Sequence, residues 1–404
     1  MDYNTLTGEE NSPQKLREGQ YHSLYEICKG IEDPRAARGK QYDLAGLLMV
    51  LILAKLAGMK SLLGASDWGR DQGEQLRKQL RLPWRKMPCA NTYKYALAGL
   101  ESQRINEIFR DWLLRQEAER RCGNEPSRLA AQSEQRAVHL AIDGKVLRGT
   151  GSQVYGGEKP QQHVLHVYEV QTGIVLHQCP IADKESEVSA LKPLLKEVLC
   201  KGRILTVDAA QSYHEMPRFV KRAGGDVILL IKDNPPETRA DLELFFEDPQ
   251  ADRRTWKPYE HVEKGHGRME RRSLLTTPDL NEYLFEQWGE IGQVFRLQRE
   301  RKSAEICSVE VVYGLSTLSQ QQCSPQRLFQ LIRSHWAVEN RLHRRRDVTL
   351  GEDQCTVRLP ALAHLLAVLH SLILSLMDVH QVSNVARQIR RFSSHPQEAL
   401  AWLL

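Results

Sequence analysis

The chain has 404 residues, of which 41% are hydrophobic and 26% are charged, and its formal net charge is +5. These proportions are typical of a soluble globular protein, and the length predicts two or three structural units rather than one core. The eight cysteines are scattered without a CxxC pair and the apolar runs are short for a membrane span, which argues against a zinc site, a disulfide framework and a membrane partner.

The first third of the chain predicts an arm, a helical domain and a linker. Residues 1–19 are polar and predict a flexible arm; they are no secretory signal, so a cytoplasmic location is expected. From residue 20 to 116, apolar residues recur at spacings of three and four, which is typical of helices. This helical domain either binds DNA through a helix in a groove or only packs against the rest of the chain. Residues 117–137 are polar, contain Gly and Pro, and predict a linker.

Residues 138–236 predict alternating strands and helices. HLAIDGKVL, HVLHVYEV and IVLHQCPI predict three strands, and the short QTG between the last two predicts a hairpin. A helix at 189–199, the strand RILTVDA, a helix at 214–223 and the strand DVILLIK follow. This order is that of a ribonuclease-H-like core.

Beyond residue 236 the alternation changes. Residues 237–316 begin with a short helix and continue with β-like runs, which predict a β-rich insertion. Residues 317–380 predict the second part of the core, including a helix from Pro325 to Arg346, and residues 381–404 predict a helical tail. The predicted fold is α/β: a ribonuclease-H-like mixed sheet with a β-rich insertion, preceded by an all-α N-terminal domain.

Three acidic residues stand at positions suited to catalysis. Asp143 and Asp208 end apolar strands, and Glu339 lies on the predicted helix. We expect the three carboxylates to converge, because an oxygen-rich anionic cluster suits two Mg²⁺ or Mn²⁺ ions, which together cleave phosphodiesters. The alternative is that the aspartates form turns and the glutamate forms a salt bridge. Glu352 and Asp353 are rival third acids, placed less securely by the turn around Gly351.

Basic residues crowd around the acidic ones, which is expected of a protein that binds a phosphate backbone. The alternative is that these basic residues only make up the water-exposed faces of helices and strands. Trp256 and Trp288 are assigned to core packing rather than to stacking on a base. The candidate DNA contacts read from the residues are Lys145, Arg148, Lys232, His266, Arg268, Arg272, Arg341, Arg344 and Arg345.

Several motifs resemble those of one family. They are DGKVLRG at 143–149, TVDA at 206–209, GGDVILLIKDNPP at 224–236, GHGRMERR at 265–272 and RSHWAVENRLHRRRDVTLGED at 333–353. Together they resemble the H-repeat-associated insertion-sequence transposases, a branch of the DDE superfamily. EDPRAARGKQYDLAGLLMVLILAKLAG resembles the helical domain associated with that family. The resemblance covers roughly residues 20–380 and places the family's triad on Asp143, Asp208 and Glu339.

The resemblance implies cutting and joining of double-stranded DNA at element ends, a divalent metal, and at least a homodimer on DNA, where the protein would be associated with the nucleoid. It also implies supporting DNA contacts by His335, where relatives often carry Arg, and by Arg346, where relatives often carry Lys. The sequence departs from the family's pattern after Asp208, where AAQSYHE stands, and after ENRLH, where three arginines follow. A domesticated DNA-binding protein without catalysis therefore remains an alternative. A nuclease that only hydrolyses DNA is a further alternative, because the same carboxylates serve hydrolysis and strand transfer.

Overall fold

The computed structural model describes residues 23–123, 137–154, 157–159, 161–181, 191, 195, 197–208, 212–232, 236–265, 268–302 and 307–404. The arm expected at 1–19 lies outside the described residues. The chain divides into two compact units, and both are discontinuous in sequence. Unit 1 comprises the chain up to Glu134, Gly144–Lys184 and Glu339–Leu404, and unit 2 comprises Gln135–Asp143 and Glu185–Val338.

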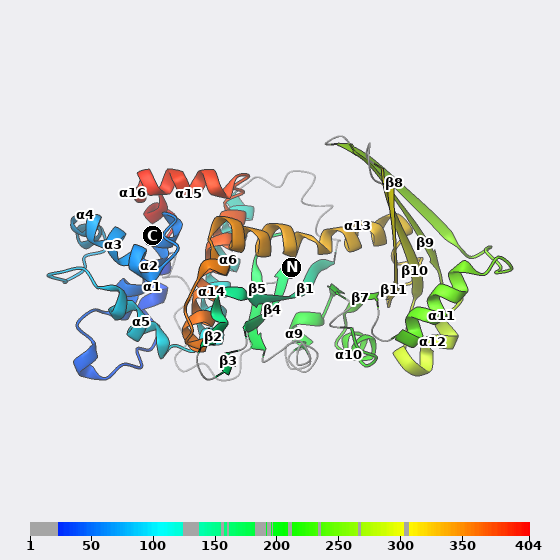
Figure 1. Ribbon diagram of the computed structural model, residues 1–404, viewed down its shortest axis with the longest axis horizontal. Helices are drawn as coiled ribbons and strands as arrows, with labels where there is room; N and C mark the ends of the chain where they lie inside the picture. The colour runs from blue at the N-terminus through cyan, green and yellow to red at the C-terminus, as the bar shows by residue number, and fades with distance from the viewer. Residues whose placement is uncertain are drawn as a thin grey trace. The chain divides into compact units, whose positions relative to one another are not determined.

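Unit 1 contains the helical region that the periodicity predicts. Its N-terminal helices are α1 (Leu24–Lys29), α2 (Leu44–Leu56), α3 (Leu62–Asp71), α4 (Gly73–Gln79), α5 (Ala90–Ala98) and α6 (Ser102–Gly123), labelled in Figure 1. Every residue of α2 is buried, as its apolar sequence predicts. Helix α6 extends through residues 117–123, into the stretch expected to be a linker, and the rest of that stretch to residue 136 lies outside the described residues.

The C-terminal helices of unit 1 pack on this region. They are α14 (Pro360–Val379), α15 (Val385–Ser394) and α16 (Pro396–Ala401), and α14 contacts α2, α5 and α6. Among the described residues, α14 is the one helix long and apolar enough to cross a membrane, but 94% of its most apolar window is buried inside the protein. Burial against other helices explains its apolar sequence.

The strands of unit 1 include the predicted hairpin. Strand β4 (Gln162–Glu169) pairs antiparallel with β5 (Val175–Ile181), and the short strands β2 (Ser152–Val154) and β3 (Gly157–Lys159) form a separate pair. Gly173, in the turn between β4 and β5, has a φ of +78°, a conformation that favours glycine. The hairpin prediction is therefore confirmed.

Unit 2 is built on a mixed sheet. Its strands are β6 (Arg203–Val207), β7 (Asp226–Ile231), β8 (Lys257–Gly265), β9 (Arg268–Thr277), β10 (Gln293–Lys302) and β11 (Cys307–Ser316). Strand β1 (Val138–Leu147) begins in unit 2 and ends in unit 1. Within unit 2 the hydrogen-bonded order runs β1-β6-β7-β11-β10-β9-β8. Strands β1, β6 and β7 are parallel, and β11 joins β7 antiparallel. The strands of the expected β-rich insertion thus extend the central sheet.

Helices cover both faces of the β8–β11 part of the sheet (Figure 1). The helices of unit 2 are α9 (Glu197–Cys200), α10 (Met216–Arg222), α11 (Pro236–Glu247), α12 (Asn281–Trp288) and α13 (Pro325–His335). Phe295 and Leu297 of β10 belong to the core cluster beneath α13, whereas Arg296 between them pairs with Glu247 of α11 at 3.0 Å. This alternation follows from the period-two geometry of a strand.

The helix expected from Pro325 to Arg346 is interrupted. Helix α13 ends at His335, and two π-helical segments follow, η5 (Val338–His343) and η6 (Arg345–Thr349). The chain passes from unit 2 to unit 1 between Val338 and Glu339, within this irregular stretch. A single-helix prediction was wrong here because π-helical turns leave no signature in the apolar periodicity.

Candidate active site

Asp143 and Asp208 come from equivalent positions of adjacent parallel strands. The register pairs Ile142 of β1 with Val207 of β6, so each aspartate is the next residue after a paired position. Adjacent strands are about 4.8 Å apart, and residues at matching register share a face. Both aspartates are half-buried. Asp143 was expected to end its strand, but strand β1 continues to Leu147.

A buried chain of hydrogen bonds holds α13 on the same face of these two strands. His139 Nε2 lies 2.8 Å from Thr206 Oγ1, and Thr206 Oγ1 lies 2.9 Å from His335 Nδ1. Ser334 Oγ lies 3.0 Å from His139 Nδ1. Burial, followed by the nearby His335 and Arg327, lowers the pKa of His139 to about 3, so its ring stays neutral. The last turn of α13 is thereby fixed to the strands that carry the aspartates.

Lys232 is the cation beside Asp208. It follows β7, and its Nζ lies 3.5 Å from Asp208 Oδ1, with 55% of the lysine side chain and 33% of the aspartate side chain exposed. Ser212 Oγ donates to the backbone oxygens of Asp208 and Leu230, which ties the segment after β6 to β7. The intervening residues 209–211 lie outside the described residues.

Glu339 is the first residue of its stretch of unit 1 and is exposed in η5. The two rival acids differ from it. Glu352 is 5% exposed and accepts two hydrogen bonds of 2.8 Å from Arg346, so its carboxylate is already used. Asp353 is partly exposed and lies 4.0 Å from the Arg148 guanidinium. Glu352 is therefore removed from the candidates for a metal ligand.

The donor set suits a hard divalent cation. Asp143 and Asp208 offer carboxylate oxygens on one face of unit 2, and oxygen ligands are those that Mg²⁺ and Mn²⁺ prefer. Within the described ranges, no group of three or more His, Cys, Asp or Glu side chains is arranged to hold a metal ion. Asp143 and Asp208 are the residues that could hold such an ion, together with a third carboxylate.

Comparison with known proteins identifies the family. The model for the transposase DDE domain matches residues 134–376, and a model described as DDE_Tnp_1-associated matches residues 25–113. This chain belongs to the DDE transposase family. The "H repeat-associated putative transposase YhhI" of Escherichia coli K12 is 25% identical over 91% of this chain and 94% of its own length. The "Putative transposase YncI" of E. coli O157:H7 is 25% identical over 88% of this chain and 87% of its own length. These similarities place this chain in the H-repeat-associated branch of the family.

Several basic residues expected to contact DNA are buried in this transposase. Arg346 is fully buried against Glu352, and His335 is 4% exposed and bonded to Thr206. Lys145 is 8% exposed, and its Nζ lies 2.6 Å from Asp347 Oδ1. Arg272 is 5% exposed between Glu263 and Glu270. Because these four side chains are buried and have partners inside the protein, they are not proposed as DNA contacts.

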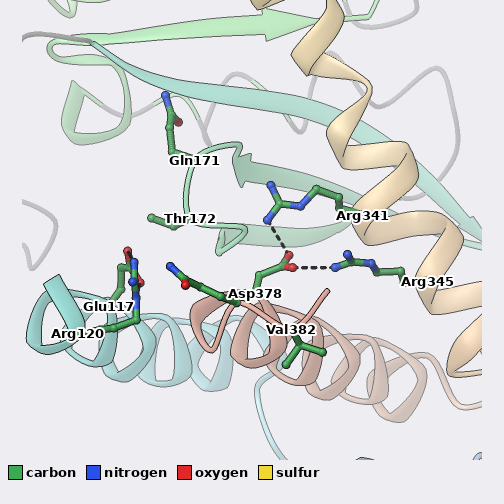
Figure 2. Close-up of a pocket in the computed structure, with 9 residues that line it drawn as sticks. Glu117, Arg120, Gln171, Thr172, Arg341, Arg345, Asp378 and Val382 are labelled. Atoms are coloured by element: carbon green, nitrogen blue, oxygen red, sulfur yellow. Dashed lines mark hydrogen bonds and ion pairs between the residues drawn. The ribbon is translucent and has the colours of Figure 1, made fainter. Parts of the chain in front are cut away.

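Arg341 and Arg345 line a polar pocket of about 290 Å³. Figure 2 shows both guanidinium groups reaching Asp378 at the end of α14, at 3.2 Å from Arg341 and 2.7 Å from Arg345. Arg341 also donates to the backbone oxygen of Val170 at 3.0 Å. Arg341 of η5 and Arg345 of η6 therefore compensate the charge of a buried carboxylate of α14.

The remaining basic candidates differ in what the structure describes. Arg148, Lys232 and Arg344 are exposed. His266 lies outside the described residues, and of Arg268 only the backbone in β9 is described. Trp256 and Trp288 are buried, 9% and 0% exposed, as the packing assignment predicts.

Sequence reasoning missed a buried cluster of charges in unit 2. Glu270 of β9 has 7% of its side chain exposed and pairs with Arg272 at 2.7 Å, Arg299 at 2.5 Å and Arg301 at 3.0 Å. Burial raises the pKa of Glu270, but the hydrogen bonds from Arg299 and Arg301 lower this pKa by a larger amount, so the net shift is downward. Charged residues at alternate positions of β9 and β10 were the available signal for this cluster.

Proposed function

We propose that this transposase cuts and joins DNA at the ends of an insertion sequence, with Asp143, Asp208 and Glu339 as catalytic carboxylates and two Mg²⁺ or Mn²⁺ ions as cofactors. The observation that carries the proposal is the register of β1 and β6, which brings two aspartates to one face of adjacent parallel strands. The match to the transposase DDE domain supports the same reading, because that family generally uses divalent metal ions. Glu339 enters through its position in HWAVENRLH, the motif that resembles the family's signature.

A ribonuclease-H-like core is part of this proposal. The parallel strands β1, β6 and β7 and the antiparallel β4–β5 hairpin support it. In chain order, β1, β4 and β5 come first, and β6 and β7 follow, which is the order of three strands and then two that the fold requires. The domain boundaries at 20–116, 117–137, 138–236, 237–316, 317–380 and 381–404 stay predictions.

Each of the proposed site residues has its own chemical role. Asp143 and Asp208 supply oxygen ligands, and the His139–Thr206–His335 chain fixes the strands that carry them. Lys232, beside Asp208, offers a positive charge to the phosphate undergoing attack. Bound ions would activate water or a 3′-hydroxyl and would stabilise the leaving oxygen. Water as nucleophile gives cleavage, and a 3′-hydroxyl gives strand joining.

The DNA partner is placed on exposed basic residues. We propose Arg148, Lys232 and Arg344 as phosphate contacts, with His266 and Arg268 as further candidates. Binding of two element ends would be made by at least a homodimer. A cytoplasmic protein associated with the nucleoid agrees with this partner.

Substitution of the three carboxylates tests the proposal. The substrate is a plasmid carrying the encoding gene with the DNA that flanks it on both sides, incubated with Mg²⁺. We expect Asp143→Asn, Asp208→Asn and Glu339→Gln to lose nicking and joining while they still bind the DNA, because each change removes a ligand charge without removing volume. Asp353→Asn is the matched control and should retain activity, since Asp353 is the rival acid that the proposal excludes.

Undiminished cleavage by the three variants would refute the assignment. Binding without cleavage by the wild type in either metal would favour a domesticated DNA-binding protein. Pre-cut ends distinguish the remaining alternative, because a hydrolysis-only nuclease would cleave but would leave such ends unjoined.

A further inference from the structure

A charged residue stands in the most apolar helix of unit 1. Lys55 belongs to α2, all of whose residues are buried, and is 4% exposed. Burying an ammonium group is costly unless partners compensate it. Its Nζ lies 3.0 Å from His370 Nε2 and 3.5 Å from the backbone oxygen of Lys60. The polar partner is therefore a histidine of α14.

His370 connects Lys55 to a buried carboxylate. Its Nδ1 lies 2.7 Å from Glu352 Oε1. Burial raises the pKa of Glu352, but Arg346 and His370 lower it more, so its net shift is downward and it stays ionised. Glu352 follows Gly351, whose φ of +67° lets the backbone turn back toward the helices.

Arg346 carries the network to the segment that contains Glu339. Its guanidinium makes two bonds of 2.8 Å to Glu352 and a short contact from Nη1 to His166 Nε2. His166 Nδ1 in turn lies 3.3 Å from His343 Nε2. His343 ends η5, four residues after Glu339. The network thus joins α2 to both π-helical segments within unit 1.

One set of tautomers satisfies every link. The Lys55 ammonium and the Arg346 guanidinium only donate, so His370 Nε2 and His166 Nε2 accept. Each ring then carries its proton on Nδ1, facing Glu352 and His343 respectively. Burial, followed by Lys55, lowers the pKa of His370 to about 4 despite the opposing Glu352, which agrees with a neutral ring.

We infer that Lys55 is a positioning residue of the proposed metal centre, which it serves by holding, through His370, Glu352 and Arg346, the segment that bears Glu339. The inference rests on the proposed function. A stabilising role does not account for Lys55, because burying its ammonium group is costly and its side-chain hydrogen bond is to a neutral histidine rather than to a carboxylate. In contrast, removing a group that orients a metal ligand lowers the affinity for the metal ion. The helical region matched as DDE_Tnp_1-associated would thereby contribute to the catalytic centre.

Lys55→Met separates positioning from stability. We expect the full-length variant to melt at or above the wild-type temperature and to bind element-end DNA normally. The Mg²⁺ concentration for half-maximal nicking should rise about tenfold, because loss of groups that orient metal ligands weakens metal affinity by about 10 to 100-fold. Lys78→Met, the same change at an exposed lysine of α4, should leave this concentration unaltered.

The outcomes that would overturn the inference are distinct. A Mg²⁺ midpoint equal to that of the wild type, with a lower melting temperature or a lower maximal rate, would show that Lys55 acts through folding alone. Glu352→Gln supplies a second check: its effect on the midpoint and that of Lys55→Met should be non-additive in the double variant, and strict additivity would contradict a shared network. If Glu339→Gln nicks like the wild type, the proposed function fails; if Glu339→Gln is inactive and the Lys55→Met midpoint is normal, only this inference fails.

Discussion

Two arginines that stand two positions apart show how little residue type says about role. Arg344 is exposed, whereas Arg346 is fully buried and bonded to Glu352. Neighbours at a spacing of two point to different sides of a helical segment. The run of arginines after Glu339, the proposed catalytic glutamate, therefore contains both a candidate phosphate contact and an internal structural group.

The salt dependence of DNA binding should distinguish the two. Arg344→Ala is expected to reduce the slope of log affinity against log salt by about 0.9, because one phosphate contact is lost. Arg346→Met should leave the slope unchanged but should lower the free energy of unfolding by about 3 kcal/mol or more, because Glu352 loses its main buried partner. Fluorescence anisotropy at several salt concentrations and urea unfolding measure these effects. Equal slopes for Arg344→Ala and the wild type would count against Arg344 as a contact.

Between elements, the sheet of unit 2 is held partly by charge. Glu270 of β9 pairs with Arg272 of its own strand and with Arg299 and Arg301 of β10. One buried carboxylate thus compensates three guanidinium groups beneath α13. Glu310 of β11 approaches the same Arg299 at only 3.8 Å, and 62% of its side chain is exposed. The two carboxylates share a partner but differ in burial.

Glu270→Gln should therefore cost far more stability than Glu310→Gln. We expect a loss of about 3 kcal/mol for the first, because it removes the one buried carboxylate that pairs with Arg272, Arg299 and Arg301. The second should change the free energy of unfolding by less than about 0.5 kcal/mol, because exposed pairs contribute little. Urea midpoints at constant slope provide the measurement. Similar midpoints for the two variants would mean that Glu270 is solvated in solution.

Across elements, the periodicity predicted the kind of element better than its ends. The β4–β5 hairpin and the buried α2 were predictable because apolar alternation and apolar runs record burial directly. The end of α13 at His335 was not, because the bonds from His335 and Ser334 to residues more than a hundred positions away determine where that helix is anchored.

At the scale of the whole molecule, buried neutral histidines make stability depend on pH. The pKa of His139 in unit 2 falls to about 3, and that of His370 in unit 1 falls to about 4, chiefly through burial. Both values lie below about 6.5, the pKa of an unfolded histidine. As pH falls below 6.5, the unfolded chain binds protons that the folded chain does not. Stability is therefore complete above pH 6.5 and is lost on acidification toward pH 4 and 3.

The free energy of unfolding should fall between pH 6.5 and pH 4.5 with a slope approaching about 1.4 kcal/mol per pH unit for each of these histidines. His139→Gln should have a lower free energy of unfolding at pH 7. Its free energy of unfolding should also fall less steeply on acidification, by the contribution of one histidine proton. Urea unfolding at several pH values tests both statements. An unchanged slope in His139→Gln would mean that His139 is protonated in the folded state.

The sequence by itself determined the acids at the strands, the helical N-terminal region and the family. It did so because apolar runs and motifs such as DGKVLRG are local records of burial and chemistry. Only the tertiary structure decided which basic residues remain exposed, that Glu352 is committed to Arg346, and that Lys55 reaches His370 315 positions away. The physical reason is that a charged side chain is buried only where a partner compensates it, and the partner is chosen by packing between distant parts of the chain.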